Sequence, residues 1–234
     1  MKKKVAFFDI DGTLFRSSLL IELVEVMVEG NILPESIRSG YEKERVRWLD
    51  RKGNYEAYIE ALVEVFMKNL KGVSYADLER AARVVHGRYR NRSYRFTRDL
   101  LLKLRRERYF LVAISQSPKI ILDLFCKEYG FDKIYGRFFE LGPQDRFTGV
   151  VTDEHIITNK ANIVRRVVAK ENLTLAGSIG VGDTEGDIGL LENVENAICF
   201  NPNAKLFSWA KRNNARVVVE RKDVIYEIAT VLKK

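Results

Sequence analysis

The stretch Lys4-Val5-Ala6-Phe7-Phe8-Asp9-Ile10-Asp11-Gly12-Thr13-Leu14-Phe15 decides the fold of this 234-residue chain. Its first part, residues 4–10, is a short apolar run rich in Val and Phe that leads into acidic residues and a glycine. Such a run is typical of a strand that is buried on both faces. Strands of this kind belong to sheets that helices cover on both sides, so the stretch favours an α/β protein.

Strands and helices alternate along the second half of the chain, beginning with an apolar strand at residues 109–115. The pattern then predicts a helix near 118–129, a strand near 134–140, a hairpin around 146–151, a helix near 160–171, a strand at 178–181, a helix near 185–192, a strand at 197–200, and a further helix, strand and helix to the end. This alternation predicts a three-layer, Rossmann-like core with a mainly parallel sheet covered on both faces.

The stretch between the first two strands, residues 16–95, has helical periodicity throughout. Apolar residues recur at helical spacing in three runs, which are Leu19-Leu20-Leu23-Val24-Met27, Tyr55-Ile59-Leu62-Val63-Phe66 and Leu78-Ala81-Ala82-Val85. We therefore predict an all-helical cap over residues 16–95, inserted after the first strand of a core made of residues 1–15 and 96–234.

The composition is that of a globular protein, with 46% hydrophobic and 31% charged residues. No apolar run reaches the ~18–20 residues that a membrane helix needs. Cys126 and Cys199 lie far apart and lack metal-ligand spacing, so we expect packed thiols and a cytoplasmic protein. The formal charge of +8 favours anionic partners without naming one, and nothing in the sequence indicates an oligomeric state.

Polar side chains fall where an open α/β sheet binds its ligands, at the carboxyl ends of strands. Asp9 and Asp11 follow the first strand, Ser115 ends the second, and Asp183 and Asp187 follow the strand at 178–181. Carboxylates that converge repel one another unless a cation joins them, and Mg²⁺ suits carboxylates together with a phosphate. The pattern therefore predicts a Mg²⁺ site at this edge of the sheet.

Two further residues suit a phosphate at the same place. Ser115 can donate a hydrogen bond to a phosphoryl oxygen, and Lys160, at the expected start of a helix, can neutralise its charge. Phosphoryl transfer depends above all on positioning and charge neutralisation, which these residues could supply.

Four segments resemble, in order and spacing, the four motifs of the haloacid dehalogenase-like (HAD) phosphatases. They are Asp9-Ile10-Asp11-Gly12-Thr13-Leu14, Ser115, Lys160 and Gly182-Asp183-Thr184-Glu185-Gly186-Asp187. The helical insertion resembles the cap that the phosphoserine-phosphatase-like branch carries between motifs one and two. Residues 114–118 and 201–206 are similar to that branch as well.

The resemblance implies a Mg²⁺-dependent hydrolysis of a small phosphorylated metabolite. It implies that Asp9 attacks phosphorus to form an aspartyl phosphate, and that Asp11 acts as general acid and then as general base. Asp9 and Asp183 would bind Mg²⁺ with the backbone carbonyl of Asp11, and Asp187 would complete or support the metal site. The phosphoryl group would be held by Ser115, Lys160, Gly12 and Thr13.

Candidate substrate contacts are Arg16 and Ser17, at the entry to the cap, and Gln116, directly after Ser115. Phosphoserine phosphatases carry a pair of glycines after the serine of motif two, whereas this chain has Gln116 and Ser117. A bulkier residue changes the pocket, so the resemblance does not extend to phosphoserine as the substrate.

Other interpretations remain beside the phosphatase. A phospho-accepting signalling module uses similar residues, but it is about half as long and lacks a large cap. Residues 80–108 hold eleven Lys or Arg and two acidic residues, which fits a solvated basic face, a wall that attracts an anionic substrate, or a nucleic-acid-binding protein with a vestigial core. The sequence predicts no specific nucleic-acid partner. The glycine-rich turn at 180–186 does not favour a dinucleotide, because Asp183 would repel the pyrophosphate.

Overall fold

The computed structural model describes residues 2–152, 157 and 159–229, which form an eight-stranded sheet in the order β4-β3-β2-β1-β5-β6-β7-β8. The strands are β1 (Lys4–Phe8), β2 (Phe110–Pro118), β3 (Lys133–Leu141), β4 (Phe147–Thr152), β5 (Thr174–Gly182), β6 (Asn196–Phe200), β7 (Arg216–Arg221) and β8 (Val224–Ile228). The five pairings from β3 to β7 are parallel, and β4 and β8 pair antiparallel at the two edges.

The α-helices are α1 (Leu19–Glu29), α2 (Glu42–Leu49), α3 (Tyr55–Leu70), α4 (Tyr75–Tyr89), α5 (Arg95–Arg106), α6 (Lys119–Tyr129), α8 (Lys160–Lys170), α9 (Ile188–Leu191) and α10 (Ala204–Asn213). Short 3₁₀ turns are η1 (Glu35–Gly40), η2 (Pro143–Asp145) and η3 (Glu185–Asp187). No helix within the described residues is both long and apolar enough to cross a membrane.

The alternating side chains of β1 build the two faces of the sheet. Val5 and Phe7 point into an apolar cluster with α8, α9 and α10, while Ala6 and Phe8 point into a second cluster with α5 and α6. All four side chains are fully buried. The strand at the centre of the sheet is thus apolar on both faces, which confirms the predicted α/β fold with a mainly parallel sheet.

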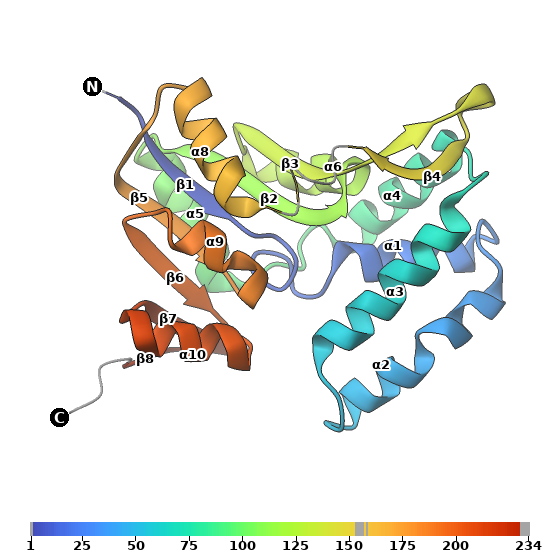
Figure 1. Ribbon diagram of the computed structural model, residues 1–234, viewed down its shortest axis with the longest axis horizontal. Helices are drawn as coiled ribbons and strands as arrows, with labels where there is room; N and C mark the ends of the chain where they lie inside the picture. The colour runs from blue at the N-terminus through green and yellow to red at the C-terminus, as the bar shows by residue number, and fades with distance from the viewer. Residues whose placement is uncertain (1, 153–156, 158, 230–234) are drawn as a thin grey trace.

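Every element between β1 and β2 is helical, as the periodicity predicted. Helices α1–α4 lie together at one side of the molecule, beyond the sheet (Figure 1). Their buried side chains, such as Leu23, Leu62 and Val85, belong to the same cluster as Phe8. One apolar core therefore runs from a face of the sheet into the helical insertion, and the cap boundaries at 16 and 95 stay a prediction.

The hairpin β3–β4 reaches from the sheet to the far end of α3. Phe147 exchanges backbone hydrogen bonds with the loop between α3 and α4, donating to Val73 and accepting from Gly72, at 2.9 and 2.8 Å. Phe66 of α3 packs edge-on against Phe139 of β3, with ring centroids 5.8 Å apart. The hairpin predicted around 146–151 is displaced, because residues 147–152 form one strand that pairs with β3 through the turn at 142–146. The β3–β4 hairpin holds one end of the insertion to the core.

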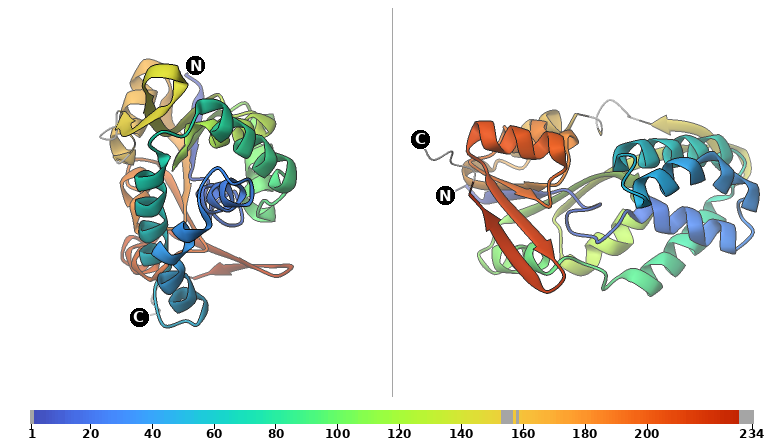
Figure 2. Two further views of the ribbon diagram at one scale, coloured as in Figure 1. Left: turned by 90° about the vertical axis from the view of Figure 1, so that its right-hand side faces the viewer. Right: turned by 90° about the horizontal axis from the view of Figure 1, so that it is seen from below.

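The predicted C-terminal helix is wrong over residues 224–228, which form β8. The hairpin β7–β8 turns through two residues, with Lys222 at φ 55°, and projects from one edge of the sheet (Figure 2). Val224, Ile225 and Tyr226 are residue types that favour strands, and β7 offers them an edge to pair with. The last part of the expected helix, residues 230–234, lies outside the described residues.

We expect Phe200→Ala to destabilise the fold by about 3–5 kcal/mol, because a large buried ring leaves a cavity. Phe200 of β6 is fully buried, contacts Tyr94 edge-on at 4.9 Å and stacks on Phe96 at 5.7 Å, so it joins the sheet to the start of α5. Urea denaturation measures the loss, with Phe200→Leu as the milder control. A loss below about 1 kcal/mol for the alanine variant would contradict this packing.

Candidate active site

The sheet order brings the carboxyl ends of β1, β2 and β5 together. β1 lies between β2 and β5, so the strands that follow β1 in the sequence lie on both of its sides in the sheet. Open α/β sheets bind their ligands at the carboxyl end of such a strand. Asp9 follows β1, Ser115 lies near the end of β2, and Asp183 follows β5. The backbone N–H of Asp9 donates to the carbonyl of Val181 at 2.9 Å, which ties the end of β1 to that of β5.

Lys160, the first residue of α8, is buried between two carboxylates. Its Nζ lies 2.7 Å from Asp9 Oδ1 and 2.5 Å from Asp187 Oδ1. Burial alone would lower the pKa of Lys160, but the charges of Asp187 and Asp9 raise it above its ordinary value. The lysine is therefore a fixed positive charge at the centre of the acidic site.

Asp187 uses both carboxylate oxygens. Oδ1 accepts from Lys160, and Oδ2 accepts from the backbone N–H groups of Asp183 and Thr184 at 3.0 and 3.1 Å. A Cβ atom at Gly182 would come within 2.4 Å of the Asp187 side chain, so glycine permits this close approach. Asp187 thus shapes the turn after β5 that presents Asp183.

Asp9, Asp183 and Asp187 fit a divalent cation. Each offers one carboxylate oxygen, and the three oxygens all lie within 4.8 Å of one another. Asp9 Oδ2 is buried and has no hydrogen-bond partner among the described residues. Burial raises the pKa of Asp9 to about 7, against the opposing effect of Lys160, and burial with repulsion from Asp9 and Asp187 raises the pKa of Asp183 well above normal. A bound cation would relieve both penalties.

Asp11 is held by hydrogen bonds to both of its oxygens. Ser115 Oγ donates to Oδ2, and the backbone N–H of Leu19, the first residue of α1, donates to Oδ1 at 2.5 Å. Ser115 Oγ in turn accepts from the backbone N–H of Ser117 at 2.9 Å. Burial raises the pKa of Asp11, although these hydrogen bonds lower it in part. Asp11 therefore lies where the core meets the first helix of the insertion.

The loop after Asp11 packs closely on Asp183. Gly12 has φ +80°, and a Cβ atom there would lie 2.1 Å from Asp183 Oδ2. Thr13 Oγ1 donates to Asp183 Oδ1 at 3.3 Å, while the backbone N–H of Gly12 donates to the carbonyls of Phe15 and Ser17. Glycine at position 12 therefore allows the loop to lie close to Asp183, and its backbone N–H already donates hydrogen bonds within the loop.

The three candidate substrate residues have other contacts. Arg16 is exposed and lies over the ring of Tyr94, 5.5 Å from its centroid. Ser17 is half-buried at φ 143°, and its carbonyl accepts from the loop. Gln116 is exposed, and its Oε1 accepts from Arg137 at 2.9 Å. The described contacts do not link these side chains to the carboxylates.

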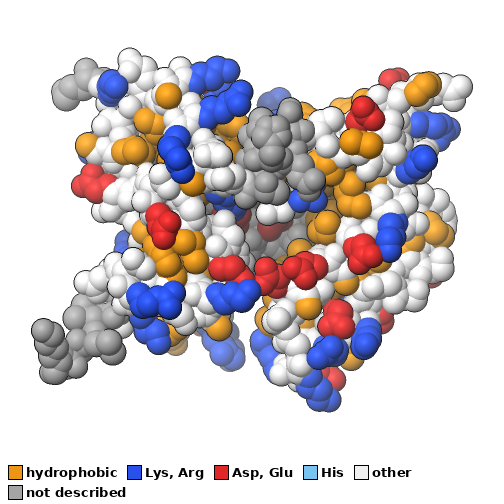
Figure 3. All heavy atoms as spheres, viewed as in Figure 1, with side chains coloured by type: hydrophobic (Ala, Val, Ile, Leu, Met, Phe, Trp, Pro, Cys, Tyr) orange, Lys and Arg blue, Asp and Glu red, His pale blue; other side chains and the backbone are white. Residues whose placement is uncertain are grey.

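The structure adds a contact across the site that the sequence did not reveal. Lys205 of α10 lies 3.3 Å from Glu56 in the first turn of α3, and it also pairs with Glu185, two residues after Asp183. Asn203 donates to Glu185 as well. Acidic side chains gather where the two halves of the molecule face each other (Figure 3). This contact holds the second end of α3 to the core.

Tyr55, beside Glu56, is the aromatic residue that α3 brings to the site. Burial raises the pKa of its phenol, and the charges of Asp11 and Asp183 raise it further. Trp48 of α2 packs on the Tyr55 ring at 5.3 Å. In the sequence this tyrosine is one member of an apolar helical run, so only the packing of α3 distinguishes it.

The sequence model of the haloacid dehalogenase-like hydrolases matches residues 6–192. The chain belongs to this family. Among curated proteins, a phosphoserine phosphatase from Archaeoglobus fulgidus is 24% identical over 201 residues, which is 86% of this chain. The matched region is 53% of that relative, so the chain spans about half of its length.

Solved structures share the fold over nearly the whole chain. A protein of unknown function from Bordetella pertussis Tohama I has a TM-score of 0.73 at 17% identity, covering 93% of this chain and 98% of its own. A substrate-bound phosphoserine phosphatase has a TM-score of 0.65 at 21% identity, with 95% of each chain covered. A phospho-aspartyl intermediate analogue of phosphoserine phosphatase has a TM-score of 0.63 at 21% identity, covering 95% of this chain and 96% of its own.

We expect Gly12→Ala to abolish activity on a generic aryl phosphate, because the added methyl group would displace Asp183 and the backbone φ is unfavourable for alanine. Gly87→Ala is the matched control: no atom lies within 4 Å of a Cβ there, and alanine suits the interior of α4. Full activity in the Gly12 variant would contradict the tight packing of this loop on Asp183.

In EDTA, we expect Asp9→Asn to be more stable than the wild type at pH 8. A raised folded-state pKa means that the contribution of Asp9 to stability falls as pH rises from its unfolded value of about 3.9 to about 7. Asparagine removes the buried charge, and a gain of about 1 kcal/mol corresponds to roughly 2–4 °C in Tm. The gain should shrink as the pH falls towards 4. A gain that grows with falling pH would show that the pKa is lowered instead.

Proposed function

We propose that this protein is a Mg²⁺-dependent phosphomonoester hydrolase that acts on a small phosphorylated metabolite through an aspartyl phosphate. The observation that carries the proposal is the buried carboxylate of Asp9, which pairs through one oxygen with Lys160 and leaves the other without a partner among the described residues. Membership of the haloacid dehalogenase-like hydrolases supports it.

Asp9 is the nucleophile in this proposal. Its free carboxylate oxygen attacks phosphorus, the bond from phosphorus to the leaving oxygen breaks, and Asp11 gives that oxygen a proton. Burial raises the pKa of Asp11, which favours its protonated form and suits it to carry this proton. Water then attacks the aspartyl phosphate while Asp11 takes up the proton of the water, which releases phosphate and restores Asp9.

Asp9 and Asp183, with the backbone carbonyl of Asp11, are the proposed ligands of Mg²⁺. The cation would neutralise the carboxylates and the phosphoryl oxygens. Asp187 supports the site, since both of its oxygens already accept hydrogen bonds from Lys160 and from the turn after β5.

Ser115, Lys160 and Thr13 are the proposed phosphate contacts. Lys160 offers a buried positive charge, and the hydroxyls of Ser115 and Thr13 each lie beside a catalytic or metal-binding carboxylate. Gly12 is also proposed to belong to the phosphate site. It has no side chain, which lets the loop come close to Asp183.

We propose that residues 16–95 form the cap and select the substrate. Burial and the charges of Asp11 and Asp183 raise the pKa of Tyr55 in α3, which supports a place for this residue beside the substrate, and Arg16, Ser17 and Gln116 would line the entry. The similarity to phosphoserine phosphatases supports a small phosphorylated substrate. Cys126 and Cys199 are both free and buried, which supports a location in the cytoplasm.

We expect Asp9→Asn to lower kcat on an aryl phosphate by about 10³-fold or more, because loss of a nucleophile removes the covalent step. EDTA should stop the wild-type reaction and Mg²⁺ should restore it. Asp50→Asn, which changes an exposed carboxylate at the end of α2, is the matched control and should keep full activity. Activity within tenfold of wild type in a folded Asp9→Asn protein, or turnover that survives chelation, would refute the proposal.

A further inference from the structure

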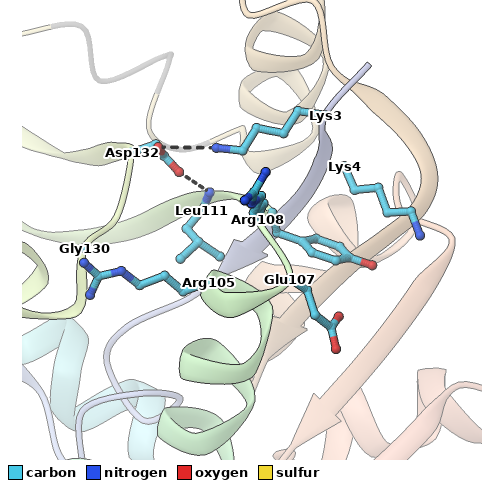
Figure 4. Close-up of a pocket in the computed structure, with 9 residues that line it drawn as sticks. Lys3, Lys4, Arg105, Glu107, Arg108, Leu111, Gly130 and Asp132 are labelled. Atoms are coloured by element: carbon cyan, nitrogen blue, oxygen red, sulfur yellow. Dashed lines mark hydrogen bonds and ion pairs between the residues drawn. The ribbon is translucent and has the colours of Figure 1, made fainter. Parts of the chain in front are cut away.

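The cavity of about 890 Å³ at the amino ends of β1 and β2 is lined by charges that point apart. Figure 4 shows Lys4 and Arg105 extending in opposite directions, with Arg105 against Gly130, while Lys4 lies against Gly177. These cations therefore do not converge on one ligand. A surface with a more definite partner lies at one edge of the sheet.

The strand β8 has an edge to which no other strand is bound. It is the last strand in the order of the sheet, and among the described residues it pairs with β7 alone. Because backbone groups alternate in direction along a strand, about half of the N–H and C=O groups of β8 face away from β7. The hairpin β7–β8 projects from the body of the molecule, so another chain can reach this edge (Figure 2).

The strand at the opposite edge, β4, is protected against such pairing. The register of β3 and β4 shifts between Phe139 and Leu141, and Phe147 exchanges hydrogen bonds with Gly72 and Val73 on the outer side of β4. Bulges, covering loops, prolines and lysines are the usual protection of sheet edges. The strand β8 has a regular register with β7 and contains neither proline nor lysine, so it lacks these protections.

One face of β8 carries an exposed apolar stripe. Val224, Tyr226 and Ile228 are 43%, 49% and 39% exposed. Tyr226 and Ile228 lie opposite Val219 and Val217 of β7, which belong to the apolar cluster that α10 covers or pack against it. The stripe therefore continues this cluster outward to the free edge, where an apolar strand of another chain could cover it.

Contacts with α5 hold the hairpin in place. The carboxylate of Glu220 accepts from the backbone N–H groups of Arg95 and Phe96 at 3.1 and 2.8 Å. The guanidinium of Arg95 donates to the carbonyl of Asp223 at 2.8 Å. Ile225 packs against the apolar cluster on the α5 side of the sheet. Since β8 is already ordered, pairing with another strand costs little conformational entropy.

The sequence of β8 is complementary to itself when two copies run antiparallel. Residues that lie opposite each other in antiparallel strands share a face of the sheet. A twofold axis at Tyr226 therefore places Val224 opposite the second copy's Ile228 and sets the two Tyr226 rings opposite each other. This register pairs all five residues of β8 and joins the two apolar stripes, and aromatic and β-branched side chains stabilise such cross-strand pairs.

Neighbouring registers are disfavoured by charge. An axis at Ile225 would place Asp223 opposite the second copy's Glu227, and an axis at Glu227 would place the two Glu227 side chains opposite each other. Like charges directly opposite destabilise a strand pair. In the register centred on Tyr226, Glu227 faces Ile225, and its charge is already paired with Arg216 of its own β7.

We propose that β8 is a dimer interface, in which two copies of this chain pair their β8 strands antiparallel about a twofold axis at Tyr226. The pairing joins the two sheets into one and closes at two copies, because both use the same edge. The strands β6 and β7 separate β8 from β5, so the interface lies away from the catalytic carboxylates of each copy.

The first test is sedimentation velocity of the full chain. We expect the wild type to sediment as a dimer and Tyr226→Lys to weaken dimerisation at least tenfold, because two ammonium groups would lie opposite each other. Val150→Lys is the matched control: it puts the same charge at a position of the opposite edge strand that is 53% exposed, and it should stay dimeric. Both variants should keep the circular dichroism spectrum of the wild type.

The second test is disulfide cross-linking with a mild oxidant. Tyr226→Cys should form a covalent dimer, because Cα atoms of residues directly opposite lie about 4.5–5.5 Å apart. Val224→Cys lies on the same face, but in this register its two copies are four residues or about 13 Å apart, so it should not form a disulfide. Cys126 and Cys199 are buried, which keeps the background low.

Three results would overturn the proposal. The first is a monomeric wild type, and the second is a Tyr226→Lys variant that dimerises as the wild type does. The third is loss of the dimer in Val150→Lys to the same extent as in Tyr226→Lys, which would show a general effect of charge. Cross-linking of Val224→Cys that equals or exceeds that of Tyr226→Cys would contradict the twofold axis at Tyr226.

Discussion

The buried contact of Lys160 with Asp9 and Asp187 is the interaction on which the rest of the site depends. Taking these charges out of water is costly, and the cost is recovered only where the geometry is close and the remaining oxygens are bonded. Asp187 meets that condition through the turn after β5, whereas Asp9 keeps one oxygen without a partner among the described residues. The burial of the Asp9 charge is therefore less well compensated than that of Asp187.

Close approach at glycine residues allows the charges to gather. Gly12 and Gly182 each leave room that a methyl group would fill, the first against Asp183 and the second against Asp187. The helical insertion is then held over the core at both ends of α3, by the β3–β4 hairpin at one end and by Lys205 at the other. The Lys205 contact joins exposed side chains, so it is the weaker of the two attachments.

Local pattern in the sequence was enough for the parallel strands of the sheet and for choosing the candidate residues. The apolar run of β1, the alternation after residue 109 and the helical periodicity of the insertion each follow from side-chain burial, which leaves a regular trace in the sequence. Asp9, Asp183 and Asp187 could be grouped because parallel strands end at one edge, and Lys160 because it stands at the start of a helix. Their roles stay predictions, and so do the boundaries of the cap.

Contacts between distant segments could not be predicted in this way. Tyr55, Glu56 and Lys205 approach the site only because α3 packs where it does, and no spacing in the sequence marks them. The sequence predicts a helix where β8 forms, because a short apolar run is compatible with a helix or with a strand. Pairing with the edge strand β7 favours the strand. The sequence could not assign a role to the positive charge of residues 80–108, because that role depends on which of these cations form ion pairs.

The covalent step at Asp9 is tested most directly by acid quenching of the enzyme during turnover, followed by peptide mass spectrometry. The account predicts one added phosphoryl group on the peptide that contains Asp9, labile to hydroxylamine and absent from the Asp9→Asn protein. Fragmentation that assigns the phosphoryl group to Asp11, or turnover with no phosphorylated peptide at any quench time, would contradict it.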